Sequence, residues 1–290
     1  LFKMIDLKSI NDEEIFKTMT SSGTTGQAVS KIFLDKDSAA MQTRVLSKIV
    51  GSYLGKKRRN MMIIDDESII RDKKKFNARA AGILGFSSFG KNHTYLLDDN
   101  LDLDLALLKK TIEQNGDQPL LIFGFTFLVW QKFYQQLNKL KEKIDFPENS
   151  VLIHGGGWKR LHDERVDNMQ FKRCLNDLGI LNVYDYYGMI EQTGSIFVEC
   201  EEGFLHCSDF SDVLARDEMN LTPLEFNKQG ILQVFSLLPS SYPGNSILTE
   251  DVGTIVGEDD CKCGRRGKYF LVNGRLELSE VRGCSDTRNI

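Results

Sequence analysis

A segment rich in glycine and hydroxyl side chains near the start of the chain has the residue types of a phosphate-binding loop. Glycine admits the positive φ angles that turn successive N–H groups inward, and such N–H groups form a concave anion site that hydroxyl groups can line. The spacing of a Walker A loop is absent, and a polar hairpin turn before a strand expected at residues 31–34 is the alternative. The segment, TSSGTTG, consists of Thr20, Ser21, Ser22, Gly23, Thr24, Thr25 and Gly26.

Four further segments could contribute bare backbone, aromatic faces, carboxylates and a guanidinium to the same chemistry. They are HGGGWK at 154–159, YYGMIE at 186–191, TED at 249–251 and GR at 274–275. Taken singly, a Tyr-Tyr-Gly sequence is commonly part of a core, a lone Glu191 is commonly a surface carboxylate, and a Thr-Glu-Asp sequence is commonly a turn. Their occurrence in order along one chain favours a shared site.

Alternating helix and strand patterns must position these segments in the first two thirds of the chain. Met41, Val45, Ile49 and Tyr53 recur every four residues behind Asp37, which is the pattern of a capped amphipathic helix. Strands are expected at 61–64, 119–125, 151–153 and 180–184, helices at 105–112, 127–140 and 166–178, and a glycine-punctuated stretch at 80–90. Such alternation predicts a parallel α/β sheet with ligands at the carboxyl ends of its strands, where several of the segments fall.

From about residue 196 the pattern changes to short β-like runs separated by turn residues. These runs lie at 203–207, 212–216, 230–238, 246–256 and 268–272. They predict an all-β subdomain. We therefore expect an α/β nucleotide- and acyl-binding domain at 1–195, a β-rich subdomain at 196–273 and a short tail at 274–290.

Composition excludes several classes of protein. The 290 residues carry a net charge of -4, and the basic runs at 56–59 and 73–75 lie beside acidic residues, so nucleic acid is not expected as a partner. No apolar run approaches the roughly 20 residues of a membrane-spanning helix, and no signal peptide is apparent. Six cysteines in a chain of this length favour a reducing cytoplasm over a disulfide-stapled secreted domain. The chain begins at Leu1, which is compatible with a preceding N-terminal segment.

Four cysteine and histidine residues have the types of a structural metal site. Cys261 and Cys263 are too close in sequence to form an unstrained mutual disulfide, and with Cys200 and His206 they supply the four nitrogen and sulfur ligands of a tetrahedral zinc ion. Cys207 is an alternative to His206. Because the C-x-C spacing is tighter than usual, reduced free thiols remain the other interpretation.

In order and spacing, the five segments resemble the core motifs of the adenylate-forming enzymes, the superfamily of acyl-CoA synthetases and luciferase. A narrower resemblance is to the long-chain acyl-protein synthetases of the bacterial luminescence fatty-acid reductase complex, with the phenylacetate–CoA ligases next. It rests on HGGGWK, ECEEGFLHCSDFSDV, SYPGNSILTEDVG, CKCGRRGKYF and RGCSDT. The resemblance implies an α/β fold with layered parallel sheets and helices, a small β-rich subdomain, and no large C-terminal domain.

The chemistry that the resemblance implies is the reaction of ATP with a carboxylate to give an acyl-adenylate and pyrophosphate. Such a transfer depends on holding the phosphates and neutralising their charge. The segment TSSGTTG would cradle the β- and γ-phosphates, and Glu191 would bind Mg²⁺, which prefers carboxylate oxygen. At position 190 this chain has Ile190 where the superfamily often has threonine, which puts one contact with the α-phosphate in doubt.

The remaining nucleotide contacts are expected from the four further segments. Tyr187, beside Tyr186 and before Gly188, would offer an aromatic face to adenine, and the glycine run would allow close approach of the backbone. Asp251 would accept hydrogen bonds from both ribose hydroxyls, and Arg275 would reach ribose or phosphate. The glycine run consists of Gly155, Gly156 and Gly157.

The resemblance also implies an acyl acceptor in the tail. In the acyl-protein synthetases a cysteine near the C-terminus takes the acyl group as a thioester, and Cys284 in RGCSDT stands at that place. The expected function is activation of a long-chain fatty acid with ATP and Mg²⁺, transfer to Cys284, and delivery to an acyl reductase subunit that makes the aldehyde, with an acyltransferase subunit as a further partner. The alternatives are a phenylacetate-type acyl- or aryl-CoA ligase and a non-catalytic, zinc-stabilised scaffold subunit.

Overall fold

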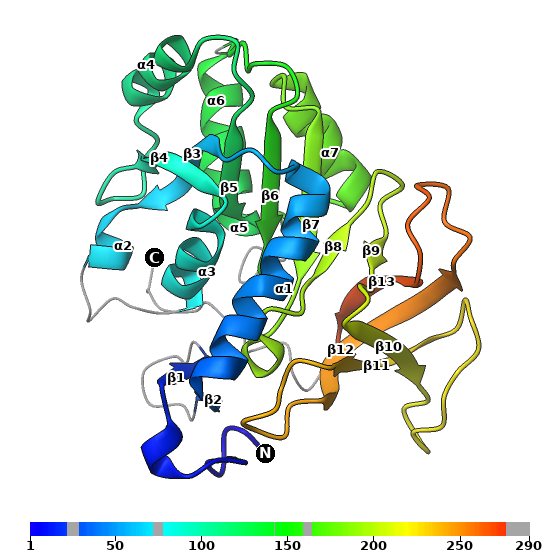
Figure 1. The fold of residues 1–290 in the computed structure, drawn as a ribbon. Helices are drawn as coiled ribbons and strands as arrows, with labels where there is room; N and C mark the ends of the chain where they lie inside the picture. The colour runs from blue at the N-terminus through cyan, green and yellow to red at the C-terminus, as the bar shows by residue number, and fades with distance from the viewer. Residues whose placement is uncertain (22–28, 72–77, 142, 159–163, 277–290) are drawn as a thin grey trace. The chain divides into compact units, whose positions relative to one another are not determined.

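The computed structural model describes residues 1–21, 29–71, 78–141, 143–158 and 164–276. Contacts between residues divide the chain into unit 1, Leu1–Tyr53 with Tyr186–Ile290, and unit 2, Leu54–Asp185 (Figure 1). The N-terminal segment belongs with the C-terminal half because Tyr242 packs in one buried cluster with Ile32 and Leu34. The division expected at residue 195 from sequence texture stays a prediction, and each unit is described by itself.

Unit 2 is built on a sheet with the strand order β4-β3-β5-β6-β7. The pairs β3–β4, β3–β5 and β5–β6 are parallel, which confirms the expected parallel α/β arrangement. The last two residues of β7 already belong to unit 1. The strands are β3 (Arg59–Asp66), β4 (Gly90–Leu97), β5 (Leu121–Phe125), β6 (Val151–Gly155) and β7 (Asn182–Tyr187).

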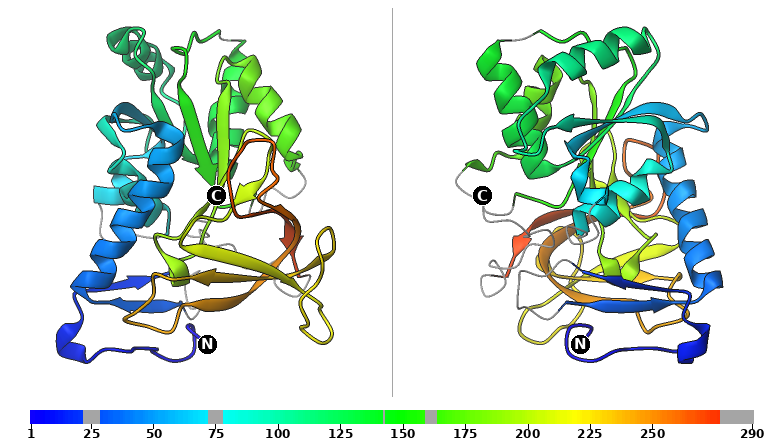
Figure 2. Two further views of the ribbon diagram at one scale, coloured as in Figure 1. Left: turned by 45° about the vertical axis from the view of Figure 1, so that its right-hand side comes forward. Right: turned by 90° about the vertical axis from the view of Figure 1, so that its left-hand side faces the viewer.

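Helical segments cover both faces of this sheet. On one face Phe86 of α3 stacks on Phe123 of β5, with ring centroids 4.5 Å apart. On the other face a Cβ at Gly124 would lie only 2.8 Å from Cγ2 of Val129, the first residue of a π-helix. The helices of unit 2 are α2 (Ser68–Arg71), α3 (Ala78–Ser87), α4 (Leu105–Asn115), α5 (Thr126–Leu128), the π-helix η3 (Val129–Tyr134), α6 (Gln135–Leu140) and α7 (Asn168–Asp177) (Figure 2).

Unit 1 combines a hairpin, a long helix and an antiparallel sheet. The hairpin strands β1 (Lys17–Thr20) and β2 (Lys31–Leu34) pair antiparallel and lead into α1 (Lys36–Leu54). The sheet has the order β10-β11-β12-β13-β9-β8, and a core of buried side chains including Phe197, Leu232, Val234 and Phe270 lies within it. The remaining elements are η1 (Asp12–Glu14), η5 (Ile190–Gln192), β8 (Phe197–Glu199), β9 (Leu205–His206), β10 (Ser211–Arg216), β11 (Gln229–Ser236), β12 (Ser246–Glu258) and β13 (Lys268–Arg275).

The glycine-punctuated stretch at 80–90, for which the sequence predicted neither helix nor strand, is largely helical. Most of it is helix α3, because Ala80, Ile83 and Phe86 recur every three residues and all three are buried. Burial of this stripe outweighs the cost of glycine in a helix, which is about 1 kcal/mol per residue. Strand β4, which follows, was not expected either. Its residues 91–94 are exposed or half-buried, so the strand lacks the continuous apolar run of its neighbours.

Among the described residues, no helix is both long enough and apolar enough to cross a membrane.

The tight packing over β5 makes Gly124 a sensitive position. We expect Gly124→Ala to lower the free energy of unfolding by about 1–3 kcal/mol, because its methyl group would press on Val129 and on Ile64 Cβ, 3.0 Å away. Gly85→Ala in α3 is the matched control, since nothing lies within 4 Å of a Cβ there, and its stability should be unchanged or higher. Urea unfolding of both variants tests this, and equal stabilities would contradict it.

Candidate functional site

The residues expected to bind nucleotide are divided between the two units. Tyr186, Tyr187, Gly188, Glu191, Asp251 and Arg275 belong to unit 1 with Thr20 and Ser21, whereas Gly155, Gly156 and Gly157 belong to unit 2. Positions 22–26 of the expected phosphate loop and the expected acyl acceptor Cys284 lie outside the described residues. The contacts within each unit show which predicted residues the fold brings together.

In unit 1 the carboxylate of Asp251 joins two other predicted residues. The Tyr187 hydroxyl donates to Asp251 Oδ2 at 2.6 Å, and Arg275 Nε donates to Asp251 Oδ1 at 2.8 Å. The pairing of β12 with β13 places Asp251 directly opposite Arg275. Burial raises the pKa of the Tyr187 phenol well above its ordinary value, and the Asp251 carboxylate raises it further. The sequence motifs YYG, TED and GR thus converge on one hydrogen-bonded group.

The Tyr187 ring packs on the core of the β-rich sheet. Its centroid lies 6.1 Å from that of Phe197 and 6.3 Å from that of Phe270. Because side chains alternate along a strand, Tyr186 points to the opposite face of β7. Gly188 follows, where a Cβ would lie 2.9 Å from Ile196 Cγ2. The assignment of adenine to Tyr187 stays a prediction, and Tyr186 presents a second aromatic side chain on the other face of β7.

Glu191 lies in the short helix η5, and its neighbour fixes this helix in place. The amide Nε2 of Gln192 donates to the carbonyl oxygens of Val234 at 3.1 Å and Gly244 at 2.9 Å. Gln192 is buried, whereas Glu191 is half-buried. The backbone that carries Glu191 is therefore held by two strong anchor points while its carboxylate can still reach solvent, as a ligand of Mg²⁺ requires.

Hydrogen bonds join Ser21, in the expected phosphate loop, to Ser30, which lies four positions beyond the last residue of that loop in the sequence. Ser21 N–H donates to Ser30 O at 2.9 Å, and Ser30 N–H donates to Ser21 Oγ at 2.9 Å. Thr20 is the last residue of β1, opposite Lys31 at the start of β2. The paired strands thus hold Thr20 and Ser21, the first two residues of the expected phosphate loop, against residues 30 and 31.

In unit 2 the glycine run follows β6 directly. Gly156 and Gly157 have φ angles of 83° and 69°, a backbone conformation that glycine adopts without strain. The Thr126 hydroxyl, at the start of α5, lies 3.1 Å from the carbonyl oxygen of Gly155 and 3.0 Å from Nδ1 of His154. The ends of β5 and β6 are therefore tied together where the glycine run begins.

His154 is a buried histidine whose environment keeps it neutral. Burial lowers its pKa to about 3, and Lys172 lowers it further. Asp185 Oδ1 lies 3.6 Å from Nδ1. If the single Thr126 hydrogen goes to Gly155 O, which can only accept, then Nδ1 carries the proton and donates to Thr126. The ring packs on Phe171 with centroids 4.6 Å apart.

The four predicted metal ligands lie together in unit 1. One ligand atom from each of Cys200, His206, Cys261 and Cys263 lies within 4.8 Å of all the others, and only Cys263 is not fully buried. Cys207, the alternative to His206, instead packs in the apolar core of the sheet. Successive side chains in an extended strand point to opposite faces, so the geometry favours His206.

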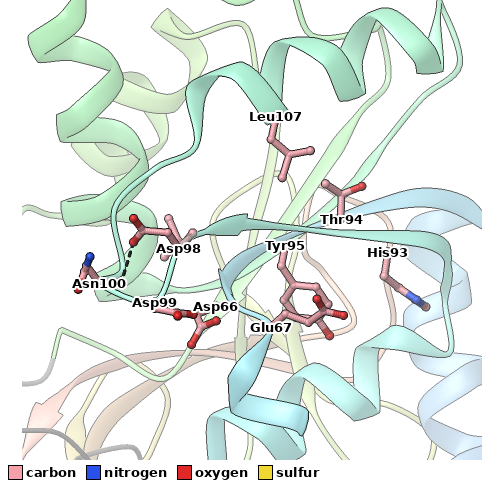
Figure 3. A pocket seen from close by; sticks show the side chains of 10 residues that line it. Asp66, Glu67, His93, Thr94, Tyr95, Asp98, Asp99, Asn100 and Leu107 are labelled. Carbon is pink, nitrogen blue, oxygen red and sulfur yellow. Dashed lines mark hydrogen bonds between the residues drawn. The ribbon is translucent and has the colours of Figure 1, made fainter.

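A separate hollow of about 760 Å³ lies at the carboxyl ends of β3 and β4 in unit 2 (Figure 3). Two of its acidic side chains accept hydrogen bonds within local turns: Asp66 Oδ1 accepts from Ser68 N–H, and Asp98 Oδ1 accepts from the N–H groups of Asn100 and Asp102. Its lining contains none of the residues predicted from the sequence motifs. The hollow therefore adds nothing to the nucleotide site.

Solved structures with the same fold are adenylate-forming ligases. A 2-hydroxyisobutyryl-CoA ligase, in an open conformation with 2-HIB-AMP and CoA, gives a TM-score of 0.66 at 14% identity and covers 92% of this chain and 59% of that chain. A long-chain-fatty-acid-CoA ligase from Archaeoglobus fulgidus gives 0.60 at 13% identity over 93% of this chain and 53% of that one. The chain thus spans somewhat more than half the length of these structures, and its fold is that of an adenylate-forming ligase.

The chain belongs to the family described as "Acyl-protein synthetase, LuxE", whose profile matches residues 1–289. Two curated relatives carry the name "Long-chain-fatty-acid--luciferin-component ligase". The protein from Vibrio harveyi is 22% identical over 295 residues, which cover 98% of this chain and 74% of that protein. The protein from Aliivibrio fischeri is 24% identical over 300 residues, which cover 98% of this chain and 75% of that protein. The resemblance read from the sequence motifs is confirmed.

Three residues near the predicted ones had no role expected from the sequence. Gln192 adjoins Glu191 and braces it, Thr126 ties the glycine run to β5, and His154 stands in HGGGWK without an expected role. For Gln192 the only sequence signal is its place beside an expected metal ligand. Thr126 had no signal, because its partner is 28 residues away in the chain.

The low pKa of His154 makes a prediction for stability. In the unfolded chain the pKa of histidine is about 6.5, so below that pH the unfolded state binds a proton that the folded state excludes. The contribution of neutral His154 is thus complete above pH 6.5 and falls as the pH is lowered, by about 2 kcal/mol at pH 5.

Urea unfolding at pH 7 and pH 5 measures this loss. We expect His154→Gln to lose less stability between the two pH values than the unsubstituted protein, while His93→Gln, at an exposed position in the same unit, behaves like the latter. Identical pH dependence in the protein and in His154→Gln would show that His154 is not buried in its neutral form.

Proposed function

We propose that this chain activates a long-chain fatty acid with ATP, forming acyl-AMP and pyrophosphate, and then transfers the acyl group to a cysteine of its own. The observation that carries this proposal is the family match over residues 1–289, together with curated relatives named for ligation of a long-chain fatty acid. The fold of an adenylate-forming ligase supports the first step. An acyl reductase that consumes the thioester, and an acyltransferase, are the proposed partners.

The contacts in unit 1 suit an adenylate. Asp251 and Arg275 supply a carboxylate for hydroxyl groups and a guanidinium for phosphate or ribose, and the fold holds them side by side at 2.8 Å. Both Asp251 oxygens accept hydrogen bonds from protein donors. Ribose hydroxyls that bind Asp251 would therefore displace these donors or donate to the same oxygens beside them. The Asp251 carboxylate would thus both hold the site together and bind the ligand.

Charge neutralisation would come from the loop after β1 and from a divalent cation. Mg²⁺, when bound, supplies electrostatic stabilisation of the triphosphate, and Glu191 is the carboxylate that would hold it. Gln192 keeps the backbone of Glu191 in position by two hydrogen bonds. In unit 2 the backbone at Gly157 allows close approach of a ligand, because nothing lies within 4 Å of a Cβ there, whereas at Gly156 the Phe125 ring would lie 2.7 Å from a Cβ.

The second step is nucleophilic attack by a thiolate on the carbonyl carbon of the acyl-adenylate. The carbon–sulfur bond forms, the bond from that carbon to the bridging oxygen breaks, and AMP leaves with the oxygen and its electron pair. The thiol proton passes to solvent or to a base before attack, since the thiolate is the nucleophile. We propose Cys284 for this role, from the resemblance of RGCSDT to the tail of the acyl-protein synthetases.

Substitution of Glu191 tests the activation step. We expect Glu191→Gln to slow fatty-acid-dependent exchange of pyrophosphate into ATP by about 10²–10³-fold, because it deletes one electrostatic contact at the place where negative charge concentrates. Glu225→Gln, at an exposed position of the same unit, is the matched control and should exchange normally. Undiminished exchange in a folded Glu191→Gln variant would remove the metal role from this residue.

Substitution of Cys284 tests the transfer step. We expect Cys284→Ser to keep pyrophosphate exchange nearly intact and to lose hydroxylamine-sensitive labelling by radioactive fatty acid, since a serine ester is far more stable to hydroxylamine than a thioester. Cys174→Ser is the control for a thiol outside the metal cluster. Labelling that persists in Cys284→Ser, or rapid release of acyl-CoA when coenzyme A is added, would favour the acyl-CoA ligase alternative.

A further inference from the structure

The cysteine and histidine cluster of unit 1 has the dimensions of a closed tetrahedral metal site. With zinc–sulfur bonds of about 2.3 Å and zinc–nitrogen bonds of about 2.0–2.1 Å, tetrahedral geometry separates two sulfurs by about 3.8 Å and a sulfur from a nitrogen by about 3.6 Å. The Sγ atoms of Cys200 and Cys261 are 4.0 Å apart, and Cys263 Sγ is 3.4 Å from His206 Nε2. Both separations agree with those edges to within a few tenths of an ångström.

The arrangement of the donors indicates zinc in a structural role. Three sulfurs and one imidazole nitrogen form the soft, four-coordinate set that zinc prefers. Because protein atoms would fill all four positions, no position is open for a substrate. Elements far apart in the sequence supply the donors: Cys200 follows β8, His206 ends β9, and Cys261 and Cys263 lie in the turn between β12 and β13. The Tyr269 ring stacks on His206, with centroids 5.5 Å apart, and limits movement of the imidazole.

Arg265 extends from this cluster to the end of helix α1. Its backbone N–H donates to Cys263 Sγ at 3.5 Å, so its own position depends on that sulfur. Its guanidinium carbon lies 3.8 Å from the centroid of the Tyr53 ring, and Nη1 donates to Ser52 Oγ at 3.3 Å. The Tyr53 hydroxyl in turn donates to the carbonyl oxygen of Val198, two residues before Cys200. Arg265 thus connects the cluster to the end of α1, and the Tyr53 hydroxyl connects the end of α1 to the strand that precedes Cys200.

The charges at this place are complementary. One Zn²⁺ ion with three thiolates and a neutral imidazole carries a net charge of about -1. The guanidinium of Arg265 is a permanent cation next to this anion, and its planar face is free to stack on an aromatic ring. Tyr53 is the last residue of unit 1 before the chain passes into unit 2. The contacts of Arg265 therefore hold the final turn of α1, whose carbonyl groups lack partners within the helix.

We propose that Cys200, His206, Cys261 and Cys263 bind one zinc ion, and that Arg265 makes this ion the anchor of the last turn of α1. Zinc binding displaces the thiol protons and fixes the turn at residues 261–264. Arg265 then holds Ser52 and Tyr53 through one hydrogen bond and one cation–π contact. The proposal concerns a structural site and does not depend on the proposed ligase activity.

The test combines metal analysis with hydrogen exchange of the full chain. We expect protein purified without chelators to contain close to one zinc per chain, both unsubstituted and as Arg265→Ala or Arg266→Ala. In Arg265→Ala at full zinc content, amides of residues 48–54 should exchange about tenfold faster, the size expected for loss of one cation–π contact and one hydrogen bond. Arg266 is exposed and adjacent, so Arg266→Ala should exchange like the unsubstituted protein.

Each other result would overturn one part of the proposal. Absence of zinc, and no uptake from added zinc after reduction, would remove the metal site. Full zinc content with unchanged exchange at 48–54 in Arg265→Ala would show that Arg265 does not couple the site to α1. Faster exchange in both arginine variants would assign the effect to loss of positive charge in general. Because Arg265→Ala keeps all four ligands, the comparison does not require a metal-free protein that folds.

Discussion

The carboxylate of Asp251 is the contact on which the candidate nucleotide site of unit 1 depends. It joins Tyr187 at the end of β7 to Arg275 at the end of β13, and these two residues are 88 positions apart in the sequence. A buried carboxylate without these donors would carry a large desolvation cost, and with them it stabilises three strand segments at once. Tyr187, Asp251 and Arg275 belong to the segments YYGMIE, TED and GR, which resemble motifs of the adenylate-forming enzymes. The side chain that joins these strands is therefore also the one proposed to bind ribose.

The hydrogen bonds of Asp251 within the protein would affect the binding of ribose. A ribose that hydrogen-bonds to Asp251 competes with Tyr187 or Arg275, so ligand binding and the internal contacts of the sheet are linked energetically. A hydrogen bond to a charged group contributes about 1.5–3 kcal/mol. The other contacts of a nucleotide could compensate for the loss of one such bond between Asp251 and Tyr187 or Arg275. Glu191 is held independently, because Gln192 anchors its helix to β11 and to Gly244.

Local patterns predicted the α/β half of the fold, because hydrophobic periodicity and turn residues can be recognised among neighbouring residues. They also singled out Tyr187, Asp251 and Arg275, which the fold brings together. The stripe at Met41, Val45 and Ile49 is indeed the helix α1. The features that the sequence did not predict depend on contacts between residues that are far apart in the chain. Helix α3 forms in spite of its glycines because its apolar stripe is buried on β5, and the N-terminal hairpin belongs with the C-terminal half because Ser241 Oγ donates to Phe33 O at 2.8 Å.

Three further features depend on strand register, on the face of a strand that a side chain occupies, and on contacts of long side chains. That Asp251 faces Arg275 depends on a β-bulge between β12 and β13, which no motif reveals. The choice of His206 over Cys207 likewise depends on which face of the extended chain each side chain occupies. The contact of Arg265 with Tyr53 joins residues more than two hundred positions apart, and neither residue type signals the other.

The most direct measurement of the central claim follows oxygen from the fatty acid. The chain is incubated with ATP, Mg²⁺ and a long-chain fatty acid labelled with ¹⁸O in both carboxyl oxygens, with hydroxylamine added to release acyl groups, and the nucleotide is examined by mass spectrometry. Activation through an acyl-adenylate predicts AMP that contains one ¹⁸O atom, because the bridging oxygen leaves with phosphorus. ADP as the product, with ¹⁸O in inorganic phosphate, or AMP without label, would contradict the account.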